Sequence, residues 1–187
     1  AAFTLAQKRR RHCTLVDKAN VLPSMAFFRK IFDEVASDFP DVQTDRIYVD
    51  AMALYLVQRP HTFDVMVTEN MFGDILSDLA AGLIGGMGMA PSADLGDEYC
   101  VFQPSHGTAP TIAGNGIANP IATILSVAML LEWLEHPETI RGARCIEQAV
   151  GQVLTDPANR TADLGVNCTT AQMRNLTAKL NTRVIDR

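Results

Sequence analysis

Short β-prone runs alternate with helical patterns of apolar residues along most of this 187-residue chain. The β-prone runs lie at 13–16, 46–49, 63–68 and 99–102. Apolar residues at spacings of three and four predict helices over 23–39, 51–59, 72–83, 120–134, 140–154 and 169–180. Strands that are separated by helices are typical of an α/β fold with parallel strands. The 120–134 helix is apolar nearly all round, so we expect it to be buried.

Charge and composition narrow the class of protein. The chain has 16 Lys and Arg residues against 21 Asp and Glu residues, which gives a net charge of −5 and a pI near 5.3. An acidic chain of this kind is a poor candidate for nucleic-acid binding. Its 48% of apolar residues excludes a disordered or collagen-like chain. The basic run at 8–12 lacks interleaved aromatic residues, so we interpret it as a solvated charged edge.

The cysteines and apolar segments indicate a cytoplasmic protein. Cys13, Cys100, Cys145 and Cys168 form no CxxC pair, so we expect reduced thiols and no zinc knuckle. The longest apolar stretch, 121–131, is too short to span a bilayer, so we expect no membrane partner. The N-terminus does not resemble a signal peptide, and the missing initial Met predicts that the chain begins inside a longer protein.

A glycine-rich segment interrupts the chain at 82–91. It holds four glycines and a proline in ten residues, a composition that ends a helix and permits unusual backbone angles. Two interpretations stay open from the sequence, a hinge between two lobes and a tight loop.

Three aspartates lie where a divalent cation can be bound. Asp74 and Asp78 are four residues apart in a helical pattern, so both carboxylates project from one helix face. Asp50 ends a predicted strand, and ligands of α/β folds collect at the carboxyl ends of strands. Carboxylate oxygens suit Mg²⁺ or Mn²⁺. The alternatives are an exposed acidic helix face for Asp74 and Asp78, and a helix N-cap for Asp50.

A lysine and a loop add further candidates. Lys18 also follows a predicted strand; it is either an ordinary surface lysine or, beside a cation, a base near neutral pH. Asn20 either caps the next helix or lies at the same site. The loop at 102–120 matches neither GxGxxG nor GxxxxGK[ST], yet its backbone N–H groups can hold a nucleotide. Within it, His106 is either a ligand contact or a hydrogen-bonded structural histidine.

Four strings occur along the chain in the order DKANVL, YVDAMA, VTENMFGDILSDLAAGLIGGMGMAPSA and HGTAPTIAGNGIANP. Together they resemble the β-decarboxylating dehydrogenases of the isocitrate/isopropylmalate dehydrogenase family, and they are most similar to its 3-isopropylmalate dehydrogenase branch. The resemblance runs from about Thr14 to the C-terminus. It implies an isopropylmalate dehydrogenase-like α/β fold that is incomplete, because about the N-terminal half is absent.

The resemblance implies metal-dependent oxidative decarboxylation of a 2-hydroxy dicarboxylic acid, with hydride transfer to NAD. Asp50, Asp74 and Asp78 would bind Mg²⁺ or Mn²⁺, and Lys18 and Asp50 would be catalytic, with Lys18 as the base. Four residues would contact the substrate: Lys18, Asn20, Val21 and Asp50. Six residues would hold the adenosine end of NAD: His106, Gly107, Thr108, Ala109, Pro110 and Asn119.

The resemblance also implies how the chain is organised. Residues 1–85 would be the remainder of a small, dimer-forming lobe with the metal site, and residues 86–187 the C-terminal part of a large lobe with the cofactor loop. Lys18 and Asp50 would come from the partner subunit, so the enzyme would be a homodimer with shared active sites. The absent half would carry the substrate-clamping arginines and a catalytic tyrosine, so we expect the chain alone to be inactive.

Two positions at which this chain departs from the family pattern, and one substrate contact that the resemblance implies, bear on the choice of cofactor and substrate. Thr111 stands where NAD-dependent relatives often have Asp, and no cation is there for the 2′-phosphate of NADP, which favours NAD. Gln103 stands just before the His106 loop, where members of the family frequently have Glu. Val21 favours an alkyl-bearing substrate such as 3-isopropylmalate, an intermediate of leucine biosynthesis. The alternatives are a tartrate/D-malate or isocitrate/homoisocitrate dehydrogenase, or a non-catalytic regulatory subunit of the same fold.

Overall fold

The computed structural model describes residues 1–185, with side chains described as far as residue 181. The chain divides into two compact units, Ala1–Ala80 and Ala81–Arg187. The first unit holds a parallel sheet and the second holds an antiparallel pair of strands. The predicted α/β fold class is therefore confirmed. Within residues 1–185, no helix is both long and apolar enough to cross a membrane.

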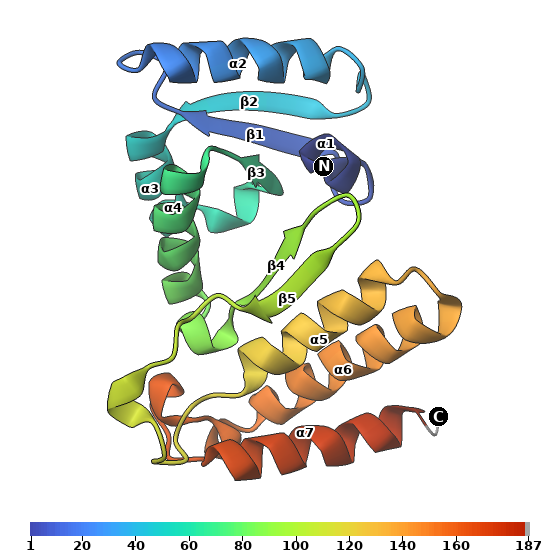
Figure 1. Ribbon diagram of the computed structural model, residues 1–187. Coiled ribbons are helices and arrows are strands. Elements are labelled where there is room, and N and C mark those ends of the chain that lie inside the picture. The colour runs from blue at the N-terminus through green and yellow to red at the C-terminus, as the bar shows by residue number, and fades with distance from the viewer. Residues whose placement is uncertain (186–187) are drawn as a thin grey trace. The chain divides into compact units, whose positions relative to one another are not determined.

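A three-stranded parallel sheet in the order β2-β1-β3 forms the centre of the first unit (Figure 1). The elements of this part are α1 (Ala2–Gln7), β1 (His12–Asp17), α2 (Pro23–Ala36), β2 (Gln43–Tyr48), α3 (Val49–Gln58), η1 (Pro60–Thr62), β3 (Val65–Val67) and α4 (Asn70–Leu83). In the register of β1 and β2, Asp17 pairs with Tyr48. The two parallel strands therefore end side by side at one edge of the sheet, and the residues that follow them meet there.

Strand β1 is buried on both faces, as is typical of a central parallel strand that helices cover. One buried cluster joins β1 to α1 and α2, and in it the rings of Phe3 and Phe32 lie 5.1 Å apart. A second cluster contains Val16, Met52 and Leu76 and holds α3 and α4 against the sheet. Full burial of one aliphatic side chain of this kind contributes about 1.5–3 kcal/mol. The two clusters therefore fix the carboxyl end of β1.

Three long helices and a two-stranded antiparallel sheet form the second unit (Figure 1). Its elements are η2 (Met87–Met89), β4 (Pro91–Leu95), β5 (Cys100–Pro104), η3 (Pro110–Ile112), α5 (Ile121–Trp133), α6 (Pro137–Thr155), η4 (Pro157–Asn159), η5 (Ala162–Leu164) and α7 (Thr170–Ile185). Helix α6 packs against both α5 and α7. Ile121 at the start of α5 and Met173 on α7 are fully buried in the cluster that joins these helices.

Three features differ from the sequence prediction. Helix α1 has six residues, too few to establish a helical period in the sequence. Strand β4 contains Pro91 and Asp94 rather than a β-prone run, and it forms because it pairs with β5. The expected burial of α5 is correct on one face only, because Val127 and Trp133 are exposed by 45% and 42%. All four cysteines are free, as expected.

The basic run at 8–12 is more than a solvated edge, so that interpretation is incomplete. Arg9 Nε and the backbone N–H of Arg10 each donate a hydrogen bond of 2.8 Å to the Asp64 carboxylate, whose side chain is 1% exposed. The Arg10 guanidinium also donates to the Phe63 carbonyl. Burial acts to raise the pKa of Asp64, but the hydrogen bonds and charges of Arg9 and Arg10 outweigh it and lower the pKa. The run therefore fastens the start of β1 to the segment before β3.

Candidate functional site

Lys18 and Asp50 meet at the carboxyl edge of the parallel sheet. Lys18 directly follows β1, and Asp50 lies in the first turn of α3, just beyond β2. The Lys18 ammonium donates a hydrogen bond to the Asp50 carboxylate, and the two form an ion pair. This hydrogen bond from Lys18 is the main cause that lowers the pKa of Asp50, with help from backbone N–H groups. The N-cap of α3 is Tyr48, so the alternative role of Asp50 as N-cap is wrong.

The turn after Lys18 presents Asn20 and Val21 to solvent. The backbone N–H groups of Val21 and Leu22 both donate to the Lys18 carbonyl, at 3.0 and 2.9 Å. This tight turn keeps Val21, whose side chain is 64% exposed, next to Lys18 along the surface. Helix α2 has Leu22 as its N-cap, without a side-chain cap, so the capping alternative for Asn20 is wrong. An exposed apolar side chain beside a charged one is suited to contact a substrate that is partly alkyl.

Asp74 and Asp78 are both exposed on α4. The start of that helix is held by Glu69, whose carboxylate accepts hydrogen bonds from the N–H groups of Met71 and Phe72 at 3.0 and 2.8 Å. Asn70 Nδ2 donates a hydrogen bond of 3.2 Å to Asp74 Oδ2. This bond orients the Asp74 carboxylate and does not involve its other oxygen, Oδ1. Two exposed carboxylates on one helix face fit a hard divalent cation that keeps some of its water ligands.

The described part of one chain does not gather the three aspartates. No group of three or more His, Cys, Asp or Glu side chains among the described residues is placed to hold a metal ion. Asp50 is held by Lys18 at the start of α3, whereas Asp74 and Asp78 lie along α4. The set that the resemblance implies is thus not gathered at one place among the described residues of one chain.

A cavity of about 530 Å³ lies beside the predicted cofactor loop in the second unit. Its wall contains loop residues, apolar side chains and three polar side chains: Met87, Gly88, His106, Ala109, Ile112, Ile117, Ala118, Asn119, Ala162 and Asp163. His106 Nδ1 lies 2.8 Å from the Gly107 carbonyl, so the predicted structural hydrogen bond is present as well. Gly107, Thr108 and Pro110 are exposed on the same loop. An apolar cavity with a few polar groups suits a planar, partly polar ligand.

Both polar atoms of the Asn119 side chain, in the wall of this cavity, are hydrogen-bonded. Its Oδ1 accepts the N–H of Ile121 at 3.0 Å, and its Nδ2 donates to Asp163 Oδ2 at 3.0 Å. Asp163 also accepts a hydrogen bond from Thr161. A Cβ atom on Gly88 would lie 2.8 Å from both Asn119 Cβ and Asp163 Oδ2, so glycine is required there for the close approach.

Three site residues are absent from the sequence prediction. Asp163 is 44 positions away from Asn119 in the sequence and accepts a hydrogen bond from its amide. Tyr48 lies near Lys18, and Arg29 lies near the Tyr48 ring. Arg29 binds Asp17, and this hydrogen-bonded carboxylate raises the pKa of the Arg29 guanidinium. A lone Asp, Arg or Tyr carries no distinctive signal, because its neighbours are set by register and helix packing.

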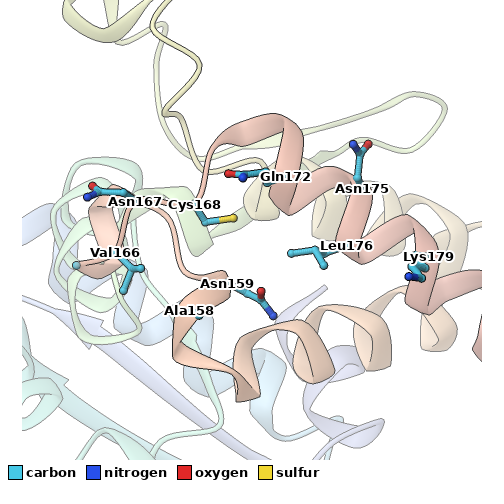
Figure 2. A pocket seen from close by; sticks show the side chains of 10 residues that line it. Ala158, Asn159, Val166, Asn167, Cys168, Gln172, Asn175, Leu176 and Lys179 are labelled. Carbon is cyan, nitrogen blue, oxygen red and sulfur yellow. The ribbon is translucent and has the colours of Figure 1, made fainter.

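A larger cavity, of about 740 Å³, lies elsewhere in the second unit and contains none of the predicted site residues. Figure 2 shows Gln172, Leu176 and Lys179 of α7 on one side of it and Asn159 on the other. Its polar side chains are mostly amides, and it lacks a cluster of acidic or nucleophilic groups. We therefore assign the candidate chemistry to the Lys18 edge and the His106 cavity.

Comparisons with known proteins agree with these features. The family profile for isocitrate/isopropylmalate dehydrogenase matches residues 1–180. A 3-isopropylmalate dehydrogenase of Aquifex aeolicus is 49% identical over 162 residues, which cover 87% of this chain and 44% of that protein. An isocitrate/homoisocitrate dehydrogenase of Thermus thermophilus is 52% identical over 172 residues, which cover 91% of this chain and 50% of that protein.

A solved structure gives the same result for the fold. The crystal structure of isocitrate dehydrogenase from Methylococcus capsulatus matches 96% of this chain with a TM-score of 0.91 and 44% identity, and the match covers 53% of that protein. The chain spans about half the length of the curated relatives it matches, so it forms an incomplete version of their fold. The resemblance inferred from the motifs is confirmed, and the chain belongs to the isocitrate/isopropylmalate dehydrogenase family.

Proposed function

We propose that this chain supplies the base, the metal ligands and part of the cofactor site of an enzyme that oxidatively decarboxylates a 2-hydroxy dicarboxylic acid. The observation that carries the proposal is the ion pair between Lys18 and Asp50 at the carboxyl ends of β1 and β2. Within the family, we propose a substrate of the 3-isopropylmalate type. The Aquifex relative carries the name 3-isopropylmalate dehydrogenase, and the exposed Val21 beside Lys18 suits an alkyl group.

Lys18 is the residue that takes the proton of the substrate hydroxyl in this proposal. Its side chain is 26% exposed, so the amine is reachable from solvent while its stem is held by the fold. Asp50, Asp74 and Asp78 would hold Mg²⁺ or Mn²⁺, because exposed carboxylates are the ligands these ions prefer. When bound, the ion lowers the pKa of the hydroxyl and stabilises negative charge on the substrate oxygen. Asn20 and Val21 line the approach to Lys18.

The cofactor in this proposal is NAD, which supplies the hydride acceptor when it is bound. Six residues would hold its adenosine end: His106, Gly107, Thr108, Ala109, Pro110 and Asn119. Ile112 and Ile117 give the cavity apolar walls for an adenine ring, and Asn119 offers a buried amide at its edge. Thr111 is exposed and uncharged, which favours NAD over NADP.

We also propose that two copies of the chain share each site in a homodimer. The division of the three aspartates within one chain supports this arrangement, because a partner's Asp50 position can complete the pair on α4. Residues 1–85 would then form the small, dimer-forming lobe and residues 86–187 part of the large lobe. The free state of all four cysteines supports a cytoplasmic location.

A chimera tests the proposal without depending on the length of the chain. In it, this chain replaces the matching segment of the Aquifex aeolicus relative, and NADH formation is measured with 3-isopropylmalate, D-malate, tartrate and isocitrate in the presence of Mn²⁺. We expect turnover with 3-isopropylmalate. Lys18→Met should lower kcat by about 10²–10⁴-fold, the usual contribution of a general base, and Asp74→Asn should raise the Mn²⁺ concentration needed for half-maximal activity.

The matched control for Asp74→Asn is Asp38→Asn, which removes an exposed carboxylate of the same unit and should change neither quantity. A folded chimera that reduces NAD with none of the four acids would contradict the proposal. Full activity of Lys18→Met would show that Lys18 is not the base. Turnover of isocitrate alone would show that isocitrate, and not 3-isopropylmalate, is the substrate.

A further inference from the structure

Strand β1 ends in a buried carboxylate directly before Lys18. Asp17 is fully buried, and Arg29 of α2 donates to both of its oxygens, at 2.8 Å from Nε and 2.7 Å from Nη2. The N–H of Ala19 donates to Asp17 Oδ1 at 3.0 Å. Burying the Asp17 carboxylate costs desolvation free energy, and removing Arg29, whose side chain is 28% exposed, would leave that buried charge uncompensated. The hydrogen bond from Ala19 to Asp17 therefore spans Lys18, and it holds the backbone of Lys18 in place.

Tyr48 connects the same pair to the Lys18 side chain. It stands opposite Asp17 in the register of β1 and β2. Its ring centroid lies 5.3 Å from the Arg29 guanidinium carbon and 5.8 Å from Lys18 Nζ, so two cations lie against one aromatic ring. Cations are attracted to aromatic faces at this range. Both cations thus lie close to the same ring, and each has its own carboxylate: Arg29 donates to Asp17 and Lys18 donates to Asp50.

We propose that Arg29 and Tyr48 are positioning residues for Lys18: Arg29 occupies Asp17, so that the Lys18 ammonium is directed past the Tyr48 ring to Asp50. Without Arg29, the nearest cation in sequence to the buried Asp17 is Lys18 itself. The Lys18 amine would then turn toward Asp17 and away from the edge of the sheet. The inference rests on the proposed role of Lys18 as the base, and it names residues that keep the base in place.

A lysine NMR signal measures this positioning without catalysis. The chain has four lysines, so a chain labelled with ¹³C at the lysine ε-carbons gives few signals, and the Lys18 signal is the one lost in Lys18→Arg. The Tyr48 ring current should shift this signal, and Tyr48→Leu should abolish that shift. We expect Arg29→Gln to move the Lys18 signal toward its unshifted position, and Arg29→Lys, which keeps the charge but not the two-pronged contact, to move it less.

A double variant separates positioning from a structural role. Asp17→Asn combined with Arg29→Gln leaves no buried carboxylate to draw Lys18, so the Lys18 signal should return toward its wild-type position. A purely structural role predicts that the double variant is no closer to wild type than Arg29→Gln alone. The matched control is Arg46→Gln, because Arg46 binds Asp33 at 2.8 Å and lies 5.1 Å from the Phe32 ring in the same unit. This control should leave the Lys18 signal unchanged.

Kinetics of the chimera provide the second readout. Arg29→Gln should lower kcat by about 100-fold, the scale of a small misplacement of a reacting group, with KM little changed and kcat partly recovered in the double variant. A Lys18 signal that stays at its wild-type position in folded Arg29→Gln and Arg29→Lys would overturn the inference. An inactive wild-type chimera in which the NMR shifts follow the expected pattern would overturn the proposed function and leave the positioning intact.

Discussion

Asp64 is a residue whose charged neighbours determine its protonation. Its folded-state pKa is lowered, since the hydrogen bonds and charges of Arg9 and Arg10 outweigh the effect of burial. A lowered pKa contributes stability above the unfolded-state value of about 3.9 and loses it as the pH falls through the folded-state pKa. The ion pairs of Asp64 therefore stabilise the first unit at neutral pH and cease to do so in acid.

We predict that Asp64→Asn lowers the free energy of unfolding by about 2 kcal/mol at pH 7, because hydrogen bonds to a charged group are lost. The difference from wild type should shrink as the pH falls below about 4. Urea denaturation across this pH range measures both effects. Asp41→Asn is the control, since Asp41 is exposed and accepts hydrogen bonds from the neutral Gln7. A constant difference between Asp64→Asn and wild type at every pH would contradict the assignment.

The sequence predicts some site residues and misses others for a physical reason. Lys18 and Asp50 are predictable, because the end of a strand is visible in the sequence and parallel strands bring their ends together. Arg29 and Tyr48 are not, because the contact depends on the register of β1 and β2 and on the rotation of α2. Asp163 depends in the same way on how η5 packs against Asn119.

At the scale of elements, the glycine-rich segment at 82–91 runs from the last residues of α4 to the first residue of β4. Gly85 and Gly86 have φ angles of +115° and +109°, and η2 and β4 follow at once. Gly88 lies against Asn119 and Asp163, where a Cβ atom would come within 2.8 Å. The composition of the segment predicts unusual backbone angles, but only the packing identifies which glycine lies against Asn119 and Asp163 in the wall of the His106 cavity.

We predict that Gly88→Ala destabilises the second unit by about 1–3 kcal/mol, the usual cost of overpacking. It should also weaken NAD binding to the chimera, because Asn119 and Asp163 must move apart. Gly82→Ala is the matched control: a Cβ atom there meets nothing within 4 Å, and alanine favours a helix over glycine by about 0.5–1 kcal/mol. Thermal unfolding and NAD titration check both variants, and equal effects of the two would contradict the packing argument.

Strands and long helices were predictable where the pattern of apolar residues is local. Helices α2, α3 and α6 carry such patterns and form close to the expected positions. Strand β4 has no pattern of its own, because its stability comes from pairing with β5. The exposed face of α5 was also beyond prediction, since an apolar composition does not tell which neighbour covers it.

At the scale of the whole molecule, the apolar residues left exposed on α3 and α4 bear on the proposed dimer. Leu54 and Val57 on α3 are 53% and 58% exposed, and Met71 and Ile75 on α4 are 58% and 59% exposed. These helices also carry Asp50, Asp74 and Asp78. A second copy that covers the two helices would bury the apolar side chains and bring carboxylates of two chains together.

We predict that the chain forms a dimer of twice its 20.4 kDa mass and that Ile75→Asp dissociates it. In a two-fold interface each substitution occurs twice, and each buried, unpaired carboxylate costs about 3 kcal/mol or more. The dissociation constant should therefore rise by about 10⁴-fold or more. Light scattering over a concentration series measures the mass, and electron paramagnetic resonance of Mn²⁺ measures the bound ion.

The two readouts should change together, because a metal site shared between subunits cannot survive in a monomer. Leu5→Asp is the matched control: Leu5 is 50% exposed on α1, and its replacement should leave both the mass and Mn²⁺ binding unchanged. Tight Mn²⁺ binding by monomeric Ile75→Asp would show that Asp74 and Asp78 hold the ion without the partner's Asp50. A wild-type chain that stays monomeric at every concentration would instead exclude shared sites, since Asp50 is then left with Lys18 as its partner in the same chain.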